Sequence, residues 1–451
     1  MGPTITPPRR VTIVGGGLAG CEAAWQLACR GVSVTLVEMK PATYSPAHKS
    51  PNLAELVCSN SLKSLQLATA TGVLKEELTL LGSLVMTAAR LHAVPAGNAL
   101  SVDRERFSEE ITRQITAHPR VRMECRVIRS LGDIGERPAI LATGPLTHPD
   151  LVDDLKKVTR SEALHFYDAT SPILFADSID TSIVFRGSRY GKGGDDYLNI
   201  PLDKSQYEAF VEAILKADKV PLHPFESETY YEGCMPVEVL AERGRDTLAF
   251  GPMKPVGLTD PRTGKRPYAV IQLRQEDLSR ELYSMVGFQT KMTFPEQERI
   301  FRTLPGLEKA EFARFGTIHR NFYLNSPEIL TARLELRNAA GVHLAGQITG
   351  VEGYLESTAM GLLCALFLLF PEIPPPPSTT VLGGLYRHVT TPQKRFVPMG
   401  ANWGLVRPLK QGVKRREKKA ALVRRALADM RAWNKLIPIE NTKNGYIMER
   451  P

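Results

Sequence analysis

The sequence predicts an α/β fold with a Rossmann-type parallel sheet, and three stretches of the chain support this prediction. Residues 11–38 run as an apolar strand, a glycine-rich turn, a helix and a second strand. Residues 138–146 and residues 341–361 are two further strands, each of which ends in a turn that contains glycine. Strands that alternate with helices in this way are typical of parallel sheets with helices on both faces.

The turn after the first strand has the spacing GxGxxG of a dinucleotide-binding site. It comprises Gly15, Gly16, Gly17, Leu18, Ala19 and Gly20. The first glycine of such a pattern permits the tight turn, the second lets the backbone approach a pyrophosphate, and the third lets the helix pack on the strand. Glu38 ends the second strand, where a carboxylate can accept hydrogen bonds from a ribose hydroxyl. Strand, helix, second strand and acid are all in register, so we interpret this segment as dinucleotide-binding.

The two later segments extend this interpretation to FAD. The strand that reaches Gly144 can pass beneath a cofactor, although an ordinary buried strand is the favoured reading of that segment alone. In the third segment Gly346 and Gln347 follow a strand, and the N-terminus of the next helix could hold a phosphate or the flavin edge. Together the three segments resemble the FAD-binding pattern of glutathione-reductase-like flavoproteins, in which Asp usually stands at the position of Gln347.

Length and composition indicate a globular protein of two or three domains. The chain has 451 residues, of which 43% are hydrophobic and 23% charged. We expect a discontinuous FAD-binding domain, made of residues 1–164 and 326–451, with an α+β insertion domain of residues 165–325 between them. The longest apolar run, Ala359 to Phe370, is too short to span a bilayer and predicts a buried helix. With no apolar signal segment at the N-terminus, we expect a cytoplasmic protein without a membrane partner.

The six cysteines contain no CxxC pair, which argues against a zinc site, a disulfide scaffold and a CxxC redox motif. No metal is therefore expected. Four cysteines in predicted helices and strands are expected to be core residues, namely Cys21, Cys29, Cys125 and Cys364. Cys58 and Cys234 lie in irregular segments, where a thiol near cations can have a lowered pKa and act as a nucleophile. An inert thiol remains an equal alternative for each of these two.

A basic segment lies near the C-terminus. Residues 407–435 contain eleven Lys or Arg and two acids, a net charge of +9 that equals the charge of the whole chain. A localised basic segment favours a polyanion such as nucleic acid, and a solvated basic helix face is the alternative.

Four segments together resemble one known family. VGGGLAGCEAA, LVCSNSLKS, YYEGCMPVE and HLAGQITGVEGYLES are similar to the folate- and FAD-dependent tRNA (uracil-5-)-methyltransferases of the TrmFO family, and the resemblance covers nearly the whole chain. It implies C5-methylation of uridine at position 54 in the tRNA T loop, giving 5-methyluridine. The one-carbon unit would come from 5,10-methylenetetrahydrofolate, with reduced FAD as reductant and methylene carrier. NADPH or NADH would regenerate the reduced flavin.

The resemblance also assigns roles to residues. Cys234 matches the family cysteine implicated as the nucleophile that adds to uracil C6, and Cys58 matches the second family cysteine. Tyr354 matches the flavin-stacking tyrosine, with a core aromatic at a helix start as the alternative. The segment His319 to Pro327 is a candidate folate site or pocket wall, although interior packing is favoured. The basic segment would contact tRNA phosphates, and the target base would be flipped into the flavin pocket.

Three other functions compete with this one. A wobble-uridine modification enzyme like GidA/MnmG shares the first and third segments, but its members are longer and carry a C-terminal helical domain. A flavin disulfide reductase or NAD(P)H oxidase would have a CxxxxC motif in the first third of the chain, and none is present. A nonenzymatic FAD- or RNA-binding protein would not need two cysteines in irregular segments.

Overall fold

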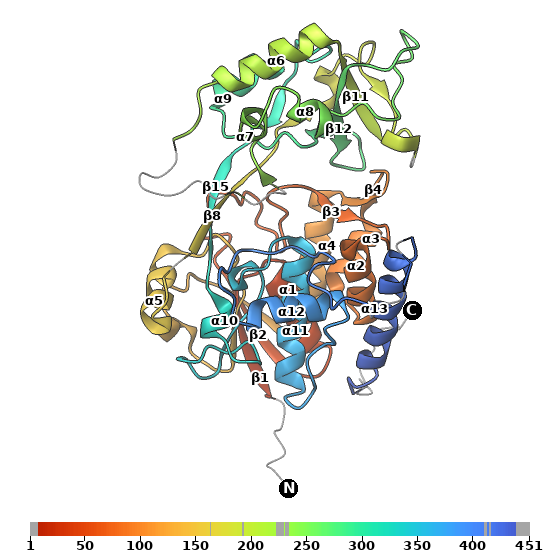
Figure 1. The fold of residues 1–451 in the computed structure, drawn as a ribbon. Coiled ribbons are helices and arrows are strands. Elements are labelled where there is room, and N and C mark those ends of the chain that lie inside the picture. The colour runs from red at the N-terminus through yellow and green to blue at the C-terminus, as the bar shows by residue number, and fades with distance from the viewer. Residues whose placement is uncertain are drawn as a thin grey trace.

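The computed structural model describes residues 8–162, 164–191, 194–221, 230, 234–409, 413–414 and 416–438. Two parts are visible, one above the other in Figure 1, and the chain crosses between them on the strands β8 and β15. The lower part in that view contains both ends of the described chain, and the upper part is formed by the middle of the chain.

The lower part is built on a parallel five-stranded sheet in the order β16–β7–β1–β2–β6. Its strands are β1 (Arg10–Val14), β2 (Ser33–Glu38), β6 (Val121–Cys125), β7 (Ala139–Leu141) and β16 (Val342–Leu344). The central strands are apolar and buried because helices cover both faces of a parallel sheet. The predicted α/β fold with a Rossmann-type sheet is confirmed, and strands from all three glycine-containing segments lie side by side in it.

Several helices of the lower part begin where their sequences supply caps. Side chains of Thr69, Ser83, Asp103 and Thr380 each accept a hydrogen bond from a backbone N–H of the first helical turn. The helical elements of this part are α1 (Leu18–Ala28), α2 (Ala70–Leu80), α3 (Leu84–Leu91), α4 (Arg104–Ala117), η1 (Leu131–Ile134), α5 (Pro149–Thr159), α10 (Ser326–Ile329), η5 (Gln347–Thr349), α11 (Tyr354–Leu369), α12 (Val381–Thr390) and α13 (Lys418–Asn434).

Helices α1 and α11 pack against each other at the centre of the lower part (Figure 1). A Cβ atom at Gly361 would lie 2.1 Å from the carbonyl oxygen of Ala19, so the absence of a side chain lets the two backbones touch. The apolar run is buried along α11, as the sequence predicted. Among the described helices, none combines the length and the apolar character that crossing a membrane requires.

The upper part contains an antiparallel six-stranded sheet in the order β10–β11–β12–β13–β9–β14. Its strands are β9 (Ile173–Phe175), β10 (Phe185–Arg186), β11 (Tyr197–Leu202), β12 (Ala269–Gln275), β13 (Leu282–Met285) and β14 (Phe312–Arg314). Its helical elements are η2 (Ala176–Ser178), η3 (Arg189–Gly191), α6 (Lys204–Lys216), α7 (Val237–Glu242), α8 (Thr247–Phe250) and α9 (Phe294–Phe301). This part has its own apolar core, separate from the core around the parallel sheet.

Two small sheets lie where the parts meet. The antiparallel ribbon of β8 (Leu164–Ala169) and β15 (Ile318–Tyr323) connects them, and the sheet β3–β5–β4 faces the upper part (Figure 1). The strands of the second sheet are β3 (Ser61–Ser64), β4 (Ala93–Val94) and β5 (Ala99–Val102). The domain boundaries after residues 164 and 325 stay predictions.

Three of the four cysteines expected in the core are buried, and one is not. Cys125 is exposed, because it ends β6, which is the edge strand of the parallel sheet. The prediction of a core role for Cys125 is therefore wrong.

Candidate active site

The glycine-rich turn joins β1 to α1 and leaves an open cradle at the helix N-terminus. A Cβ atom at Gly20 would lie 1.9 Å from the carbonyl oxygen of Gly15, so this glycine lets the helix pack directly on the turn. A Cβ atom at Gly17 would meet no atom within 4 Å, because that position faces an empty cleft. The first helical turn therefore presents backbone N–H groups to open space, an arrangement that suits an anionic pyrophosphate.

One cleft collects most of the residues predicted to bind the cofactor. Its empty volume, including the part open to solvent, is about 1120 Å³. The predicted residues that line it are Gly15, Gly16, Gly17, Leu18, Ala19, Glu38, Gly144, Gly346, Gln347 and Tyr354. Gly20 does not line the cleft, because it packs behind the turn. Gly144 also has open space where a Cβ atom would stand, so the backbone can approach a bound group closely there.

Glu38 braces the turn from the end of β2. Its carboxylate accepts hydrogen bonds from the backbone N–H groups of Gly16, at 2.6 Å, and Lys40, at 3.0 Å. The side chain is largely buried but still lines the cleft. A carboxylate held in this way has remaining lone pairs for the hydroxyls of a ribose.

The loop that carries Cys58 is anchored from both parts of the molecule. The hydroxyl of Tyr354, at the start of α11, accepts hydrogen bonds from the backbone N–H groups of Cys58, at 2.8 Å, and Ser59, at 3.1 Å. The Arg104 guanidinium donates to the carbonyl oxygens of Leu56 and Cys58 at 2.7 and 3.2 Å. The same guanidinium pairs at 2.5 Å with Glu276, the residue that directly follows β12.

Cys58 and Cys234, which are 176 positions apart in the sequence, meet beside Asp168 at the junction of the two parts. The Sγ atoms of the two cysteines and a carboxylate oxygen of Asp168 all lie within 4.8 Å of one another. The residues line a second cleft that shares Gln347 and Tyr354 with the first. The structure therefore brings both predicted catalytic cysteines to the mouth of the predicted cofactor cleft.

The surroundings of Cys234 favour its neutral thiol. A hydrogen bond with Cys58, burial and the negative charge of Asp168 raise the pKa of Cys234 well above its ordinary value. The sequence left two alternatives for Cys234, a thiolate stabilised by nearby cations and an inert thiol, and the surroundings do not provide the first, because the charged neighbour is a carboxylate. A nucleophilic thiolate at this position requires a base to remove its proton.

The other titratable groups of the second cleft are shifted by burial. Burial raises the pKa of Asp168 to about 6, and it raises the pKa of Glu352 well above the usual range of a carboxylic acid. Burial lowers the pKa of His319 to about 4, so this imidazole is neutral at physiological pH. Shifted pKa values of this kind cluster at functional sites.

Sequence reasoning missed Asp168 and Glu352, and it left the segment of His319 with two alternatives. This segment contributes both a pocket wall and interior packing, and its role as a folate site stays a prediction. His319 and Asn321 are two positions apart on β15 and therefore share one face of the strand. His319 and Asn321 line the cleft, whereas Phe322 and Tyr323 are buried. Asp168 carries no local signal, since its position beside the thiols depends on the pairing of β8 with β15.

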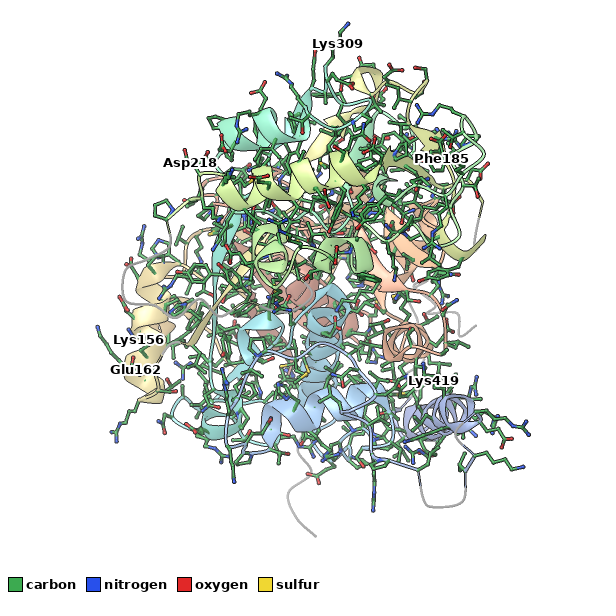
Figure 2. All side chains as sticks on the ribbon, turned by 45° about the horizontal axis from the view of Figure 1, so that its top comes forward. Lys156, Glu162, Phe185, Asp218, Lys309 and Lys419 are labelled. Atoms are coloured by element: carbon green, nitrogen blue, oxygen red, sulfur yellow. The ribbon has the colours of Figure 1, made fainter. Side chains whose placement is uncertain are left out.

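Residues 418–434 of the basic segment form the outer helix α13. The other described residues of the segment flank this helix, and residues 410–412 and 415 lie outside the described residues. Leu422, Ala426, Met430 and Trp433 form its buried face, and the helix packs beside α2 (Figure 1). Its exposed cations include Lys418, Lys419, Arg424 and Arg431. Lys419 projects away from the body of the protein in Figure 2.

The chain resembles proteins of known name over nearly its full length. It matches the family described as Glucose inhibited division protein A over residues 10–369. It is 53% identical, over 431 residues, to the methylenetetrahydrofolate–tRNA-(uracil-5-)-methyltransferase TrmFO of Geobacter sulfurreducens, with 94% of this chain and 98% of that protein covered. The enzyme of the same name from Geotalea uraniireducens is 54% identical over 434 residues, with the same coverage.

Solved structures support the fold. GidA of Aquifex aeolicus superposes with a TM-score of 0.65 at 15% identity, over 95% of this chain and 76% of that chain. At this level of identity the likeness concerns the fold alone.

Proposed function

This chain belongs to the TrmFO methyltransferases within the GidA family, and we propose that it methylates C5 of the uridine at position 54 in the tRNA T loop, giving 5-methyluridine. The donor in this proposal is 5,10-methylenetetrahydrofolate, and NADPH or NADH supplies the reducing equivalents through FAD. The observation that carries the proposal is the meeting of Cys58, Asp168 and Cys234 where the glycine-lined cleft opens.

The residues of the first cleft fit FAD. A Cβ atom at Gly17 would fill the cradle at the N-terminus of α1, where backbone N–H groups face the position of a pyrophosphate. Glu38 would accept hydrogen bonds from the ribose, and Gly144, Gly346, Gln347 and Tyr354 would line the remainder of the site. When bound, FAD supplies the redox chemistry that reduces a one-carbon unit to a methyl group.

The two thiols suit chemistry at uracil. C5 of uracil is a poor nucleophile until a group adds at C6 and turns the ring into an enolate. We assign that addition to Sγ of Cys234, and elimination of the same sulfur after loss of the C5 proton restores the ring. Cys58 is the second thiol of the site, and its Sγ lies 3.7 Å from the carbonyl oxygen of Ala169, to which it donates.

The substrate is large and negatively charged, and α13 offers a matching surface. Its exposed lysines and arginines would contact tRNA phosphates, which give salt-dependent affinity with little sequence preference. Because the thiols lie inside a cleft, the target uridine has to be flipped out of the folded loop to reach them. A wobble-uridine function is less well supported, since the relatives at 53 and 54% identity carry the name of the uracil-5-methyltransferase.

A donor competition tests the proposal. The FAD-loaded protein is incubated with unmodified tRNA, NADPH and methylenetetrahydrofolate labelled in its one-carbon unit, and in parallel with labelled S-adenosylmethionine. We expect label in T-loop 5-methyluridine from the folate donor alone. Cys234→Ala should abolish this transfer, whereas Cys125→Ala, at the exposed end of β6, should retain it. Absence of label from both donors, with flavin bound and reducible, would contradict the proposal.

A further inference from the structure

Asp168 occupies a buried position with one free oxygen. It lies on β8 opposite His319 of β15, so its side chain emerges on the face of the ribbon that lines the second cleft. Its Oδ1 is buried and has no hydrogen-bond partner among the described residues. A buried carboxylate oxygen without a partner is costly, and such an atom in a cleft commonly has a chemical role.

The two thiols of the site differ in what they face. Cys58 donates to the carbonyl oxygen of Ala169, a group that cannot take a proton from it. Cys234 interacts both with Cys58 and with the carboxylate of Asp168, which also interacts with the amide of Asn321. Of the two thiols, Cys234 therefore has the contact through which a proton can leave.

The charges around Asp168 leave it as the basic group of the cleft. Burial keeps His319, on β15, neutral by lowering its pKa to about 4. Glu352, ahead of α11, retains its proton because burial and the charge of Asp168 raise its pKa. Lys63, on β3, lies near Glu352 and is paired with Glu356. The pKa of Asp168 itself, raised by burial to about 6, is close to working pH, which is optimal for a general base.

We propose that Asp168 is the general base that takes the proton of Cys234 when its sulfur adds to uracil, an inference that rests on the proposed function. The S–H bond of Cys234 breaks and its proton passes to the carboxylate of Asp168. The Sγ–C6 bond forms, and the C5–C6 π electrons move into the enolate that ends at O4. On elimination the Sγ–C6 bond breaks, the sulfur keeps the electron pair, and Asp168 returns the proton to it.

A covalent trap measures this step. The FAD-loaded protein is mixed with methylenetetrahydrofolate, NADPH and a T-loop RNA stem-loop that carries 5-fluorouridine at the target position. Fluorine at C5 cannot leave as a proton, so the adduct between Cys234 and C6 persists and is measured on denaturing gels and by mass spectrometry. Rates are compared for wild type, Asp168→Asn, Asp168→Glu and the control Asp177→Asn, an exposed acid of the upper part.

The expected result has a specific dependence on pH. In wild type the adduct rate rises as Asp168 ionises near pH 6 and is then level to about pH 8. In Asp168→Asn the adduct rate at neutral pH should be about 100-fold lower than in wild type, which is the usual contribution of a general base. It should then rise about tenfold per pH unit and not level off above pH 6. Asp168→Glu, which keeps a carboxylate, should recover part of the adduct rate and the levelling of this rate with pH. Flavin absorbance and flavin reduction by NADPH should be unchanged in all variants, and Asp177→Asn should match wild type.

Two results would overturn the inference. An Asp168→Asn adduct rate equal to or above that of wild type between about pH 6 and 8 would show that Cys234 reacts without this base, while the proposed function stands. If Asp168→Asn does not load FAD, the pH dependence of wild type decides. A wild-type adduct rate that rises tenfold per pH unit up to about pH 9, without levelling off above pH 6, contradicts the inference. Failure of the wild type to form any adduct, with FAD bound and reduced, would instead overturn the proposed function together with the inference.

Discussion

Replacing Tyr354 by Phe separates two roles that its phenol ring and its hydroxyl could play. The family resemblance implies that the ring stacks on the flavin. The structure shows that the hydroxyl accepts two hydrogen bonds, from the N–H groups of Cys58 and Ser59 at 2.8 and 3.1 Å. Burial raises the pKa of this phenol, so the hydroxyl stays protonated. Tyr354→Phe keeps the ring and removes only the anchor of the Cys58 loop.

The magnitude follows from those two bonds. A hydrogen bond of this kind contributes about 1 kcal/mol net, so losing both costs about 2 kcal/mol. If the cost falls on the local position of the loop, the population of the competent loop drops about 30-fold, because 1.4 kcal/mol corresponds to a factor of ten. The loop remains attached through Arg104, which donates to the carbonyl oxygens of Leu56 and Cys58, so the protein should still fold.

Three measurements on the same preparation test this reasoning. We expect Tyr354→Phe to retain the flavin absorbance and FAD affinity of wild type, to lose about 2 kcal/mol or less in urea unfolding, and to methylate about 30-fold more slowly. Tyr354→Leu, which removes the ring as well, should in addition weaken FAD binding. Wild-type methylation by Tyr354→Phe would refute the anchoring role, and unchanged FAD affinity in Tyr354→Leu would refute the stacking role.

Three further predictions concern the cofactor cradle, the basic helix and stability. Gly17→Ala should weaken FAD binding with unchanged folding, because the new methyl group would enter the cradle. Gly20→Ala, whose Cβ would lie 1.9 Å from a backbone oxygen, should instead lower the yield of folded protein. Flavin fluorescence titration and thermal unfolding distinguish the two. Charge reversal at Lys418 and Lys419 should weaken tRNA binding, while flavin reduction is unaffected. The slope of log K for tRNA against log salt concentration should become shallower by about 0.9 per lost phosphate contact. The matched control reverses two exposed cations of α6, Lys204 and Lys216. Burial raises the pKa of Glu77 from 4.5 to about 8, so between these pH values the folded state binds more protons than the unfolded state. The free energy of unfolding should therefore fall as pH rises through that window. Urea unfolding at about pH 5, 6.5 and 8 should show a weaker dependence of this free energy on pH in Glu77→Gln than in wild type.

The fold was predictable because its signals are local. Each signal lies within one segment of the sequence: the GxGxxG turn, the acid at the end of the second strand and the apolar run. The structure confirms the parallel sheet and the buried helix α11 that these signals predict. Cys125 shows where local reasoning fails. Its strand looks like any other in the sequence, but β6 is at the edge of the sheet, and only the strand order reveals this.

Cys58 and Cys234 were singled out by their irregular segments, and the family resemblance assigned their roles. The groups that surround them depend on strand register, which the sequence does not reveal. Asp168 reaches the thiols because β8 pairs with β15 so that it stands opposite His319. Adjacent residues of a strand point to opposite faces, so a shift of one residue would turn Asp168 away from the cleft. No composition or spacing rule in the sequence determines this register, and for that reason the raised pKa of Cys234 could not be anticipated.

The site is completed only when the two parts of the molecule are docked. Cys58 belongs to a loop of the lower part, whereas Asp168 lies on the connecting ribbon. The loop is held from the upper part by Arg274, which donates to Ser59 and Asn60 at 2.8 and 2.7 Å, and by the pair of Arg104 with Glu276. The carboxylate of Glu276 is almost fully buried, and removing one partner of a buried ion pair is strongly destabilising. These polar contacts therefore do more than join two parts, because the distance between Cys58 and Asp168 depends on them.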